Sequence, residues 1–216
     1  MPSHAEVLIR PYRQGDRADV RAISCETAFL GKHELFFDDD EILADALTQY
    51  YTDYEPTSCF VAESESAVVG YIIGAKDVTR MATIFWRDIF NGLLIKAWQH
   101  KVFFQRKASS FFLHIAVSAL RGEFISPHFA RQYPAALHIN IRQGFRGQGV
   151  GTRLIARYVS YARETGVKGI HFGVFSHGAR EFFEKTGFKV LFKGNRSFFR
   201  YRLGEDVPFF VLGKIL

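Results

Sequence analysis

A run of alternating glycines in the middle of the chain has the residue types of an anion-binding loop. It lies within LHINIRQGFRGQGVGTRLIARYVSYARET, residues 137–165. Glycine removes the side chain that would hold a ligand away from the backbone, and it adopts backbone angles that other residues avoid. A helix that starts at such a loop directs its free amides and the positive end of its dipole at an anion. Arg146 adds a cation to this stretch, called the glycine loop below, which contains Gly144, Gly147, Gly149 and Gly151.

The residues on either side of the glycine loop predict a strand before it and a helix after it. Leu137–Ile141 is a short apolar run of strand type. Gly166 is well placed as the C-terminal cap of the helix. The loop lacks both the Gly-Lys-Ser/Thr ending of a Walker loop and the GxGxxG spacing of a dinucleotide-binding fold. The apolar face at helical spacing comprises Leu154, Ile155, Tyr158, Val159 and Ala162.

Two blocks of the sequence resemble the GCN5-related N-acetyltransferase (GNAT) superfamily. Arg146-x-x-Gly149-x-Gly151 is similar to its acyl-CoA signature, Q/R-x-x-G-x-G/A. Ala179–Phe188, AREFFEKTGF, is similar to A-x-x-F-Y-E-K-x-G-F, the helix and strand start that closes this fold. The blocks occur in the family's order. The resemblance implies an α/β GNAT fold over residues 1–216, a single domain whose mixed central sheet has splayed parallel strands and flanking helices.

The resemblance also implies acetyl-CoA as cosubstrate, no metal, and direct transfer of the acetyl group to an amine acceptor, which is either a small amine or a protein. The thioester would lie between the strands Leu137–Ile141 and Ile170–Phe175, with the backbone of Ile139 and Ile141 pairing with the pantetheine arm like an added strand. An amide near Ile141 would stabilise the oxyanion. The residues expected to bind the cofactor are Ile139, Ile141, Arg146, Gly147, Gln148, Gly149, Val150, Gly151, Thr152 and Ser176.

The attacking amine must be neutral, so a general base is expected, and three residues are candidates. His138 and Asn140 share the face of the strand opposite Ile139 and Ile141. His138 has a suitable ordinary pKa near ~6.5, although a strand histidine is more often a packed core residue. An amide is no base, so Asn140 would position water. Glu63 ends the first strand of a predicted hairpin, where a surface carboxylate beside the turn is the plainer interpretation.

Two positions depart from the family's pattern. Phe183 occupies the place of the Tyr that often protonates the leaving sulfur, and a phenyl ring has no proton to donate. Ser176 stands where an Asn often touches the cofactor, and it keeps a hydroxyl group. Three hypotheses follow. Another side chain or water donates the proton, the thiolate leaves unaided, or the protein is a non-catalytic acyl-CoA-binding or interaction module.

Acidic residues are concentrated in one N-terminal segment. Residues 26–55 hold nine Asp and Glu and one base, Lys32. We interpret them first as helix caps and solvated helix faces. The resemblance offers a second interpretation, because the first two helices of GNAT proteins border the acceptor site and an acidic rim there would attract a cationic amine. The formal net charge of the whole chain is +6, for which the phosphates of coenzyme A are a sufficient reason.

A segment before the glycine loop is longer than a minimal GNAT domain requires. Residues 78–133 carry eight Lys and Arg against two acids, and we predict a helical insertion there. Within it, Met81–Phe104 is amphipathic, so we expect it to cover the sheet and build the acceptor pocket. Binding to a membrane surface or RNA is the less favoured alternative. Periodicity does not separate strand from helix for Ser109–Leu120. The predicted apolar stripe is Phe85, Ile89, Phe90, Leu93, Leu94, Ala97 and Trp98.

The remaining elements follow the family's order. We predict a first strand, a helix capped by Asp16, a second helix after Asp38–Glu41, and a hairpin. After the loop and its helix come a buried strand, a helix and three further strands. The predicted strands are Val7–Arg10, Ser58–Glu63, Ala67–Ala75, Gly169–Phe175, Phe188–Leu191, Phe198–Leu203 and Val207–Ile215, and the last helix is Ala179–Thr186.

The composition is that of a globular protein from a reducing compartment. The 216 residues are 48% hydrophobic and 23% charged, which suffices for one sizeable core. Cys25 and Cys59 form neither a metal pattern nor a disulfide framework. There is no secretory core at the N-terminus, and the uncharged runs fall short of the ~20 apolar residues of a spanning helix. We therefore predict a cytoplasmic monomer or homodimer.

Overall fold

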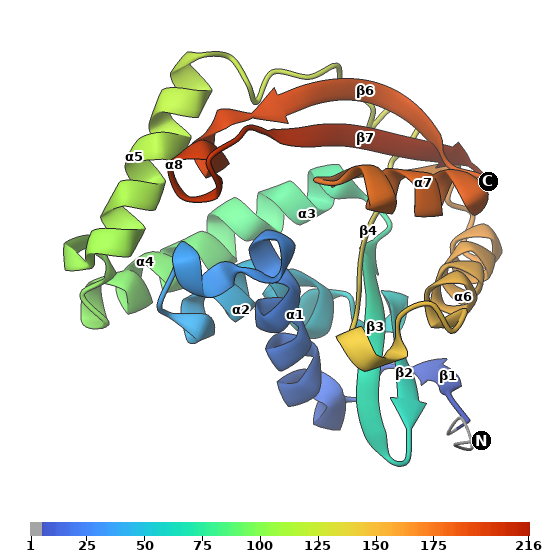
Figure 1. Ribbon diagram of the computed structural model, residues 1–216. Helices are drawn as coiled ribbons and strands as arrows, with labels where there is room; N and C mark the ends of the chain where they lie inside the picture. Colours follow the sequence, from blue (N-terminus) through green and yellow to red (C-terminus); the bar gives the residue numbers. More distant parts are fainter. Residues whose placement is uncertain (1–5) are drawn as a thin grey trace.

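The computed structural model describes residues 6–216, in which two antiparallel sheets meet edge to edge (Figure 1). The first sheet has the strand order β1-β2-β3-β4 and the second β5-β7-β6. The strands are β1 (Leu8–Pro11), β2 (Cys59–Ser64), β3 (Ala67–Ala75), β4 (Ala136–Ile141), β5 (Gly169–Val174), β6 (Lys189–Arg196) and β7 (Val207–Ile215). The helices are α1 (Arg17–Gly31), α2 (Asp40–Gln49), α3 (Val78–Ile84), α4 (Phe90–Gln99), α5 (Arg106–Leu120), α6 (Val150–Glu164), α7 (His177–Lys185) and α8 (Arg200–Leu203).

The two sheets are joined through the residue that precedes β4. The Ala135 amide donates to the Gly169 carbonyl (3.1 Å), and the Ala135 carbonyl accepts from the His171 amide (2.8 Å). Across residues 6–216 this is the one parallel bridge between the strands, and no further backbone hydrogen bond links β4 to β5. The predicted splay of two parallel strands is therefore confirmed.

Strand alternation divides the first sheet into two buried faces. Phe60, Ala62 and Ile72 face the core that includes α6, whereas Val61 and Tyr71 face the core that includes α1. In Figure 1, α1 and α2 lie on one side of this sheet and α6 on the other. The sheet is thus covered on both faces, and the edge of β4 at the junction is left to the site described below.

Helix α6 has the face and the cap that the sequence predicts. All five predicted apolar residues of its face are buried. The Tyr158 hydroxyl donates to the Ala136 carbonyl (3.0 Å), which ties the helix to β4. Gly74 on β3 makes room for this ring, because a Cβ atom there would overlap it. Gly166 has φ +75°, and the amide of Val167 returns to the Ala162 carbonyl (2.9 Å), as in a Schellman cap.

The first helix starts directly after Asp16 but lacks the predicted side-chain cap. Asp16 gives α1 no side-chain cap; its carboxylate instead accepts from the Arg13 amide (2.7 Å) and pairs with Arg10 (2.7 Å). At the other end, Ala28 is extended and Phe29 and Leu30 take left-handed angles, so regular helical geometry ends before Ala28. The second helix is capped as its acidic start predicts, since Asp39 accepts from the Ile42 amide (2.9 Å).

The insertion is helical, but its apolar stripe is interrupted. Helices α3 and α4 are joined by a π-helical turn, Phe85–Ile89. Ile89 and Ala97 are buried as predicted, whereas Leu94 and Trp98 are 41% and 70% exposed. A π-turn adds a residue to the helical repeat, so positions spaced for a regular α-helix no longer share one face. The segment whose periodicity was ambiguous is helix α5.

One predicted strand near the C-terminus is wrong. The aromatic run Phe198–Leu203 forms a 3-10 turn and the short helix α8. The carboxylate of Glu123 accepts from both the amide (2.7 Å) and the hydroxyl (2.5 Å) of Ser197, which ends the chain's extended course after β6. Phe198 and Phe199 are buried among other phenyl rings, so their apolar character reflects burial and not strand periodicity.

The acidic segment and the basic insertion neutralise each other. Lys96 on α4 contacts Glu41 (2.5 Å) and Asp45 (2.7 Å) on α2. Lys107 at the start of α5 contacts Asp38 (2.5 Å). These contacts support the structural interpretation of the acids, which clamp the insertion to α2. No helix within residues 6–216 is long and apolar enough to cross a membrane.

Candidate active site

The glycine loop presents a row of backbone amides. Within residues 6–216, no backbone or side-chain acceptor takes the amides of Gly147, Gln148, Gly149, Val150, Gly151 and Thr152. Helix α6 starts at Val150, so its dipole reinforces the last of them. The amide of Arg146, which the sequence also placed in this row, is instead directed to the Gln143 carbonyl (3.2 Å). The row of free amides thus begins at Gly147, and its binding of an anion stays a prediction.

The glycines of the loop serve two different purposes. Gly147 and Gly149 have φ of +78° and +77°, and a Cβ at either would meet nothing within 4 Å. Their requirement is therefore conformational. Gly151 is buried, and a Cβ there would lie 2.9 Å from Phe182 of α7 and 3.2 Å from Ile141. Gly151, the last glycine of the loop, therefore lets α6 pack closely against α7 and β4.

The main chain of β4 offers an unpaired edge at the junction of the sheets. Ala135 bonds to β5, whereas the Arg142 amide bonds to Val69 of β3 (2.9 Å). Because main-chain groups alternate in direction along a strand, those of Leu137, Ile139 and Ile141 point toward β5, as those of Ala135 do. Since β5 has diverged, no backbone group of residues 6–216 pairs with this edge. It leads from the bridge at Ala135 toward the glycine loop.

Arg146 lies at the loop end of this edge. Its Nε donates to the Ile141 carbonyl (2.9 Å), and the residue is exposed. The bond fixes the start of the side chain while the remaining guanidinium nitrogens face solvent beside the free amides. The arrangement suits an anion of several charges better than a single carboxylate, since amides, helix dipole and cation converge there.

A cavity of about 480 Å³ lies where β4 and β5 part, and we call it the junction cavity. Leu137 and His138 of β4 line it together with Phe172 and Gly173 of β5. The opposite walls come from α2, from the following π-helical turn Tyr50–Tyr54, and from the insertion. The insertion contributes Met81, Ala82, Phe85 and Trp86.

His138 and Asn140 lie together, as the sequence predicts. The Asn140 amide nitrogen donates to the Tyr71 hydroxyl oxygen (2.7 Å) and lies 3.3 Å from His138 Nε2. Burial lowers the pKa of His138 to about 4, so the ring is neutral near pH 7. Desolvation also raises the pKa of Tyr71 to about 12. The group beside the cavity is therefore uncharged, and His138 is a weak base.

Glu63 does not reach this site. Its carboxylate accepts from Arg10 Nε (2.6 Å), and the same guanidinium binds Asp16. Glu63 pairs with Val68 at the hairpin end of the first sheet, whereas the junction cavity lies by Ala136, at the opposite end of β3. The structure thus brings two of the three base candidates together and leaves the third in an ion-pair network.

Phe183 and Ser176 hold α7 in place. Phe183 is 4% exposed, and its ring packs against Phe172 (4.5 Å between centroids) and Phe188 (5.7 Å). Ser176 caps α7 by accepting from the Ala179 amide (3.1 Å), which leaves its hydroxyl hydrogen able to donate. A Tyr at position 183 would bury its hydroxyl among aromatic rings, so a Phe at this position is consistent with the packing.

Sequence reasoning missed the polar residues on the far wall of the junction cavity. Tyr50 and Tyr51 both line it, and the Tyr50 hydroxyl donates to buried Glu55 (2.8 Å). Glu55 also accepts from the Ser58 hydroxyl (2.7 Å) and the Lys76 amide (3.0 Å). Burial raises the pKa of Tyr51 far above its ordinary value. The available signal was the pair of adjacent tyrosines at the end of the predicted second helix.

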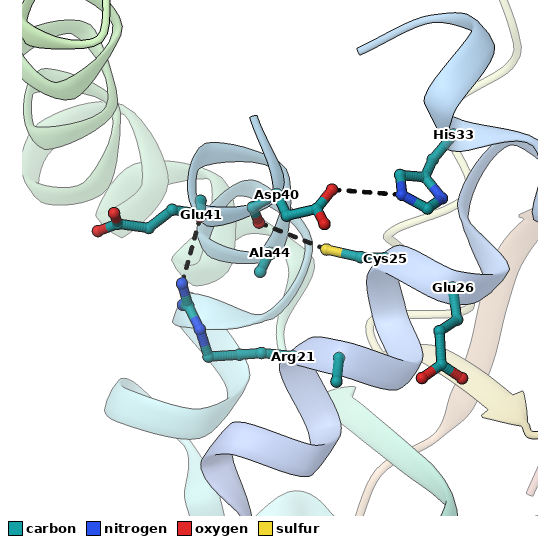
Figure 2. A pocket seen from close by; sticks show the side chains of 8 residues that line it. Arg21, Cys25, Glu26, His33, Asp40, Glu41 and Ala44 are labelled. Atoms are coloured by element: carbon teal, nitrogen blue, oxygen red, sulfur yellow. Dashed lines mark hydrogen bonds and ion pairs between the residues drawn. The ribbon is translucent and has the colours of Figure 1, made fainter. Parts of the chain in front are cut away.

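A second hollow, the α1–α2 pocket, has a volume of about 420 Å³ and carries the acids that the sequence associated with a cationic acceptor (Figure 2). Asp40 contacts His33 (3.3 Å), Glu41 contacts Lys96 (2.5 Å), and Glu26 contacts Arg142 (3.5 Å). No residue of β4 or β5 lines this pocket. The acids that line it are therefore partnered within the chain.

These features define an α/β fold with a divided sheet: two half-sheets with an unpaired edge between them, an amide-rich loop at one end of that edge and a cavity near the other. The chain belongs to the GNAT acetyltransferase family, whose model matches residues 26–188. This confirms the family to which the two sequence blocks pointed.

Solved structures share the fold at low sequence identity. SsHAT superimposes with a TM-score of 0.69 at 22% identity, covering 97% of this chain and 98% of that one. A GCN5-related N-acetyltransferase from Kribbella flavida gives 0.60 at 14%, with 97% and 98% covered. The protein yncA from Salmonella typhimurium, solved with its cofactor acetyl-CoA, gives 0.58 at 15%, with 97% and 94% covered. These matches support the α/β GNAT fold.

Proposed function

We propose that this protein transfers the acetyl group of acetyl-CoA directly to an amine acceptor. The observation that carries the proposal is the unpaired edge of β4, which runs between the free amides of the glycine loop and the junction cavity. An extended pantetheine arm with its two amides would complete this edge as a short added strand. The diphosphate would then lie on the loop and the thioester at the cavity.

The proposed binding residues follow from this placement. The main chains of Ile139 and Ile141 would hold the pantetheine arm, and the Ser176 hydroxyl would donate to it at the start of α7. The phosphate contacts would come from the guanidinium of Arg146 and the amides of Gly147, Gln148, Gly149, Val150, Gly151 and Thr152.

The reaction needs a neutral amine, a polarised carbonyl and a leaving thiolate. The amine nitrogen forms a bond to the acetyl carbon, the C–S bond breaks, and its electron pair leaves with the sulfur of coenzyme A. The Ile141 amide, which points into the gap, is the proposed oxyanion donor. His138 accepts the amine proton directly or through water that Asn140 positions. With Phe183 buried, we assign protonation of the thiolate to solvent in the cavity.

We further propose that residues 78–133 form an insertion within a single GNAT domain. Its π-helical turn brings Phe85 and Trp86 to the junction cavity, and its basic residues bind the acids of α2. The insertion would thereby close the acceptor side of the site. This role accounts for its charge without RNA or a membrane surface.

Calorimetric titration of the purified protein with acetyl-CoA tests the proposal. We expect saturable binding with a loss of affinity in Gly149→Ala, because alanine strains the left-handed backbone of the loop. Release of free coenzyme A thiol over a panel of primary amines then tests turnover. Absence of binding at millimolar acetyl-CoA contradicts the proposal.

A non-catalytic acyl-CoA-binding module is the second candidate. It is favoured by Phe183, which has no proton to donate, and by the weak basicity of His138. Tight binding of acetyl-CoA combined with no thiol release for any amine in the panel would select this candidate.

A further inference from the structure

We propose that the acceptor of this acetyltransferase is a primary amine on an apolar or aromatic body, bound in the junction cavity. This inference rests on the proposed function and adds to it the chemical class of the acceptor. It departs from the cationic acceptor that the acidic N-terminal segment suggested.

The lining of the junction cavity is aromatic and uncharged. Tyr50 and Tyr51 form one wall, Phe85 and Trp86 of the insertion form another, and Phe172 lies at the strand junction. No Asp, Glu, Lys or Arg lines the cavity, and its single titratable base, His138, is neutral. Such a lining excludes water from an apolar body and discriminates against an acceptor with several charges.

The carboxylates of α2 and of Glu55, which accepts from the cavity-lining Tyr50, have partners within the chain. Glu55 is buried and accepts three hydrogen bonds, from Tyr50, Ser58 and Lys76. Asp45 and Glu41 on α2 are held by Lys96. The acids in the α1–α2 pocket (Figure 2) also have partners, and no residue of β4 or β5 lines that pocket. An acidic surface that would hold a polyamine in line with the thioester is therefore not formed by the described residues.

The aromatic, uncharged lining of the junction cavity also favours the neutral form of the acceptor amine. Transfer from water to an apolar cavity lowers the pKa of an ammonium group, so the bound acceptor loses its proton more readily. The proton lost from nitrogen passes to His138 or water, and the C–S electron pair leaves with coenzyme A. A weakly basic His138 suffices when the cavity has already disfavoured the charged form. The aromatic walls position the body of the amine and leave its nitrogen at the strand junction.

Competition between amines is the direct test. We measure thiol release with 2-phenylethylamine and hexylamine as apolar acceptors and with spermidine as the cationic acceptor. We expect kcat/KM for the apolar amines to exceed that for spermidine by at least about tenfold, since uncompensated burial of extra charge is costly. A preference for spermidine would overturn the inference while leaving the proposed acetyl transfer intact.

Two tryptophan variants form a matched pair. Trp86 and Trp98 lie on the same insertion and are similarly exposed, at 62% and 70%, but Trp86 lines the junction cavity and Trp98 does not. We expect Trp86→Ala to raise KM for 2-phenylethylamine about tenfold with KM for acetyl-CoA unchanged, and Trp98→Ala to change neither. Equal effects of the two variants would overturn the assignment of the cavity.

A variant expected to gain activity toward one amine cannot be explained by misfolding, which lowers activity toward every amine. Ala82 is exposed on α3 at the mouth of the cavity, so Ala82→Glu adds a carboxylate without disturbing the core. We expect kcat/KM for spermidine to rise and that for hexylamine to fall. If Trp86→Ala and Ala82→Glu instead change the preference between acetyl-CoA and butyryl-CoA at constant amine preference, the cavity holds the acyl chain and the inference is wrong.

Binding measurements separate this inference from the proposed function. If acetyl-CoA does not bind, the proposed function fails by itself. If acetyl-CoA binds but no thiol is released, calorimetric titration of the coenzyme A complex with 2-phenylethylamine remains decisive. Saturable binding that is lost in Trp86→Ala and kept in Trp98→Ala supports the cavity assignment, and no binding overturns it.

Discussion

At the scale of single residues, His138 places a neutral side chain, and not a charged one, beside the proposed acceptor site. Its ring lies next to Asn140 at the edge of an aromatic cavity, and burial alone lowers its pKa to about 4. A histidine of ordinary pKa would be partly charged at neutral pH and would repel an ammonium acceptor. The neutral ring instead remains a hydrogen-bond acceptor over the physiological range.

The lowered pKa of His138 predicts a pH-dependent stability. Since the folded-state pKa is below the unfolded value, the unfolded chain binds the proton first, and stability is lost as pH falls from about 6.5 to about 4. The loss would be on the order of 2–3 kcal/mol. Urea unfolding at pH 7 and pH 4.5 measures it. His138→Gln should remove this part of the pH dependence, and the exposed His177→Gln should retain it; the same loss in His138→Gln would contradict the account.

The glycine loop supplies a second prediction at this scale. Gly149→Ala places a Cβ on a residue with φ +77° and should cost about 1–2 kcal/mol of stability or loop distortion. Affinity for acetyl-CoA should fall as the amide row is disturbed. Gly144 also has open space around it but no positive φ, so Gly144→Ala is the control. Calorimetry of both variants checks this, and equal affinities would show that the loop's backbone angles do not matter.

At the scale of elements, the edge of β4 predicts an alternating pattern of amide exchange. The amides of Leu137 and Ile139 point into the gap, whereas those of His138 and Asn140 point toward β3. In the free protein the first pair should exchange fast and the second slowly. Acetyl-CoA should slow Leu137 and Ile139 selectively, as measured by residue-resolved hydrogen exchange. Uniform protection along β4 before ligand is added would contradict an open edge.

Much of the site could be predicted from the sequence because local chemistry specifies it. The strand, the glycine loop and helix α6 follow from residues that determine their own conformation: apolar alternation, glycines with positive φ, and a Schellman glycine. The free amides and the placing of His138 beside Asn140 follow from the same short stretch. The splay of the two strands was predicted from the resemblance to the GNAT family and not from these residues alone.

The parts that could not be predicted depend on contacts distant in sequence. Residues of α2, the insertion, β4 and β5 line the junction cavity together, so the periodicity of any single segment does not predict it. The local sequence predicts Asp16 as a helix cap, but its carboxylate pairs with Arg10. It also predicts Phe198–Leu203 as a strand, but Glu123 binds Ser197 and ends the extended chain there. The π-helical turn rotates the predicted stripe. In each case a tertiary partner overrode a sound local preference.

At the scale of the whole molecule, the clamp between α2 and the insertion predicts a stability effect. Asp45 is nearly buried, and both Lys96 and Arg21 contact it. Lys96→Met removes one partner and should lower the free energy of unfolding by about 1–2 kcal/mol, with less effect in high salt on the more exposed Glu41 contact. Lys185→Met, on the exposed face of α7, is the control. Equal unfolding energies for both variants in urea would show that the clamp contributes nothing.

The chain contains two tryptophans, and both lie exposed in the insertion, one lining the cavity and one away from it. Its tryptophan fluorescence therefore originates entirely in the insertion, and Trp86 contributes the part that comes from the cavity lining. Trp98→Phe would leave a single tryptophan, Trp86, whose ring lies 4.8 Å from that of Phe90 between centroids, with the two planes tilted by 60°. The unlabelled protein then carries its own optical probe of the acceptor site, with which occupancy can be followed in stopped-flow mixing during a single turnover.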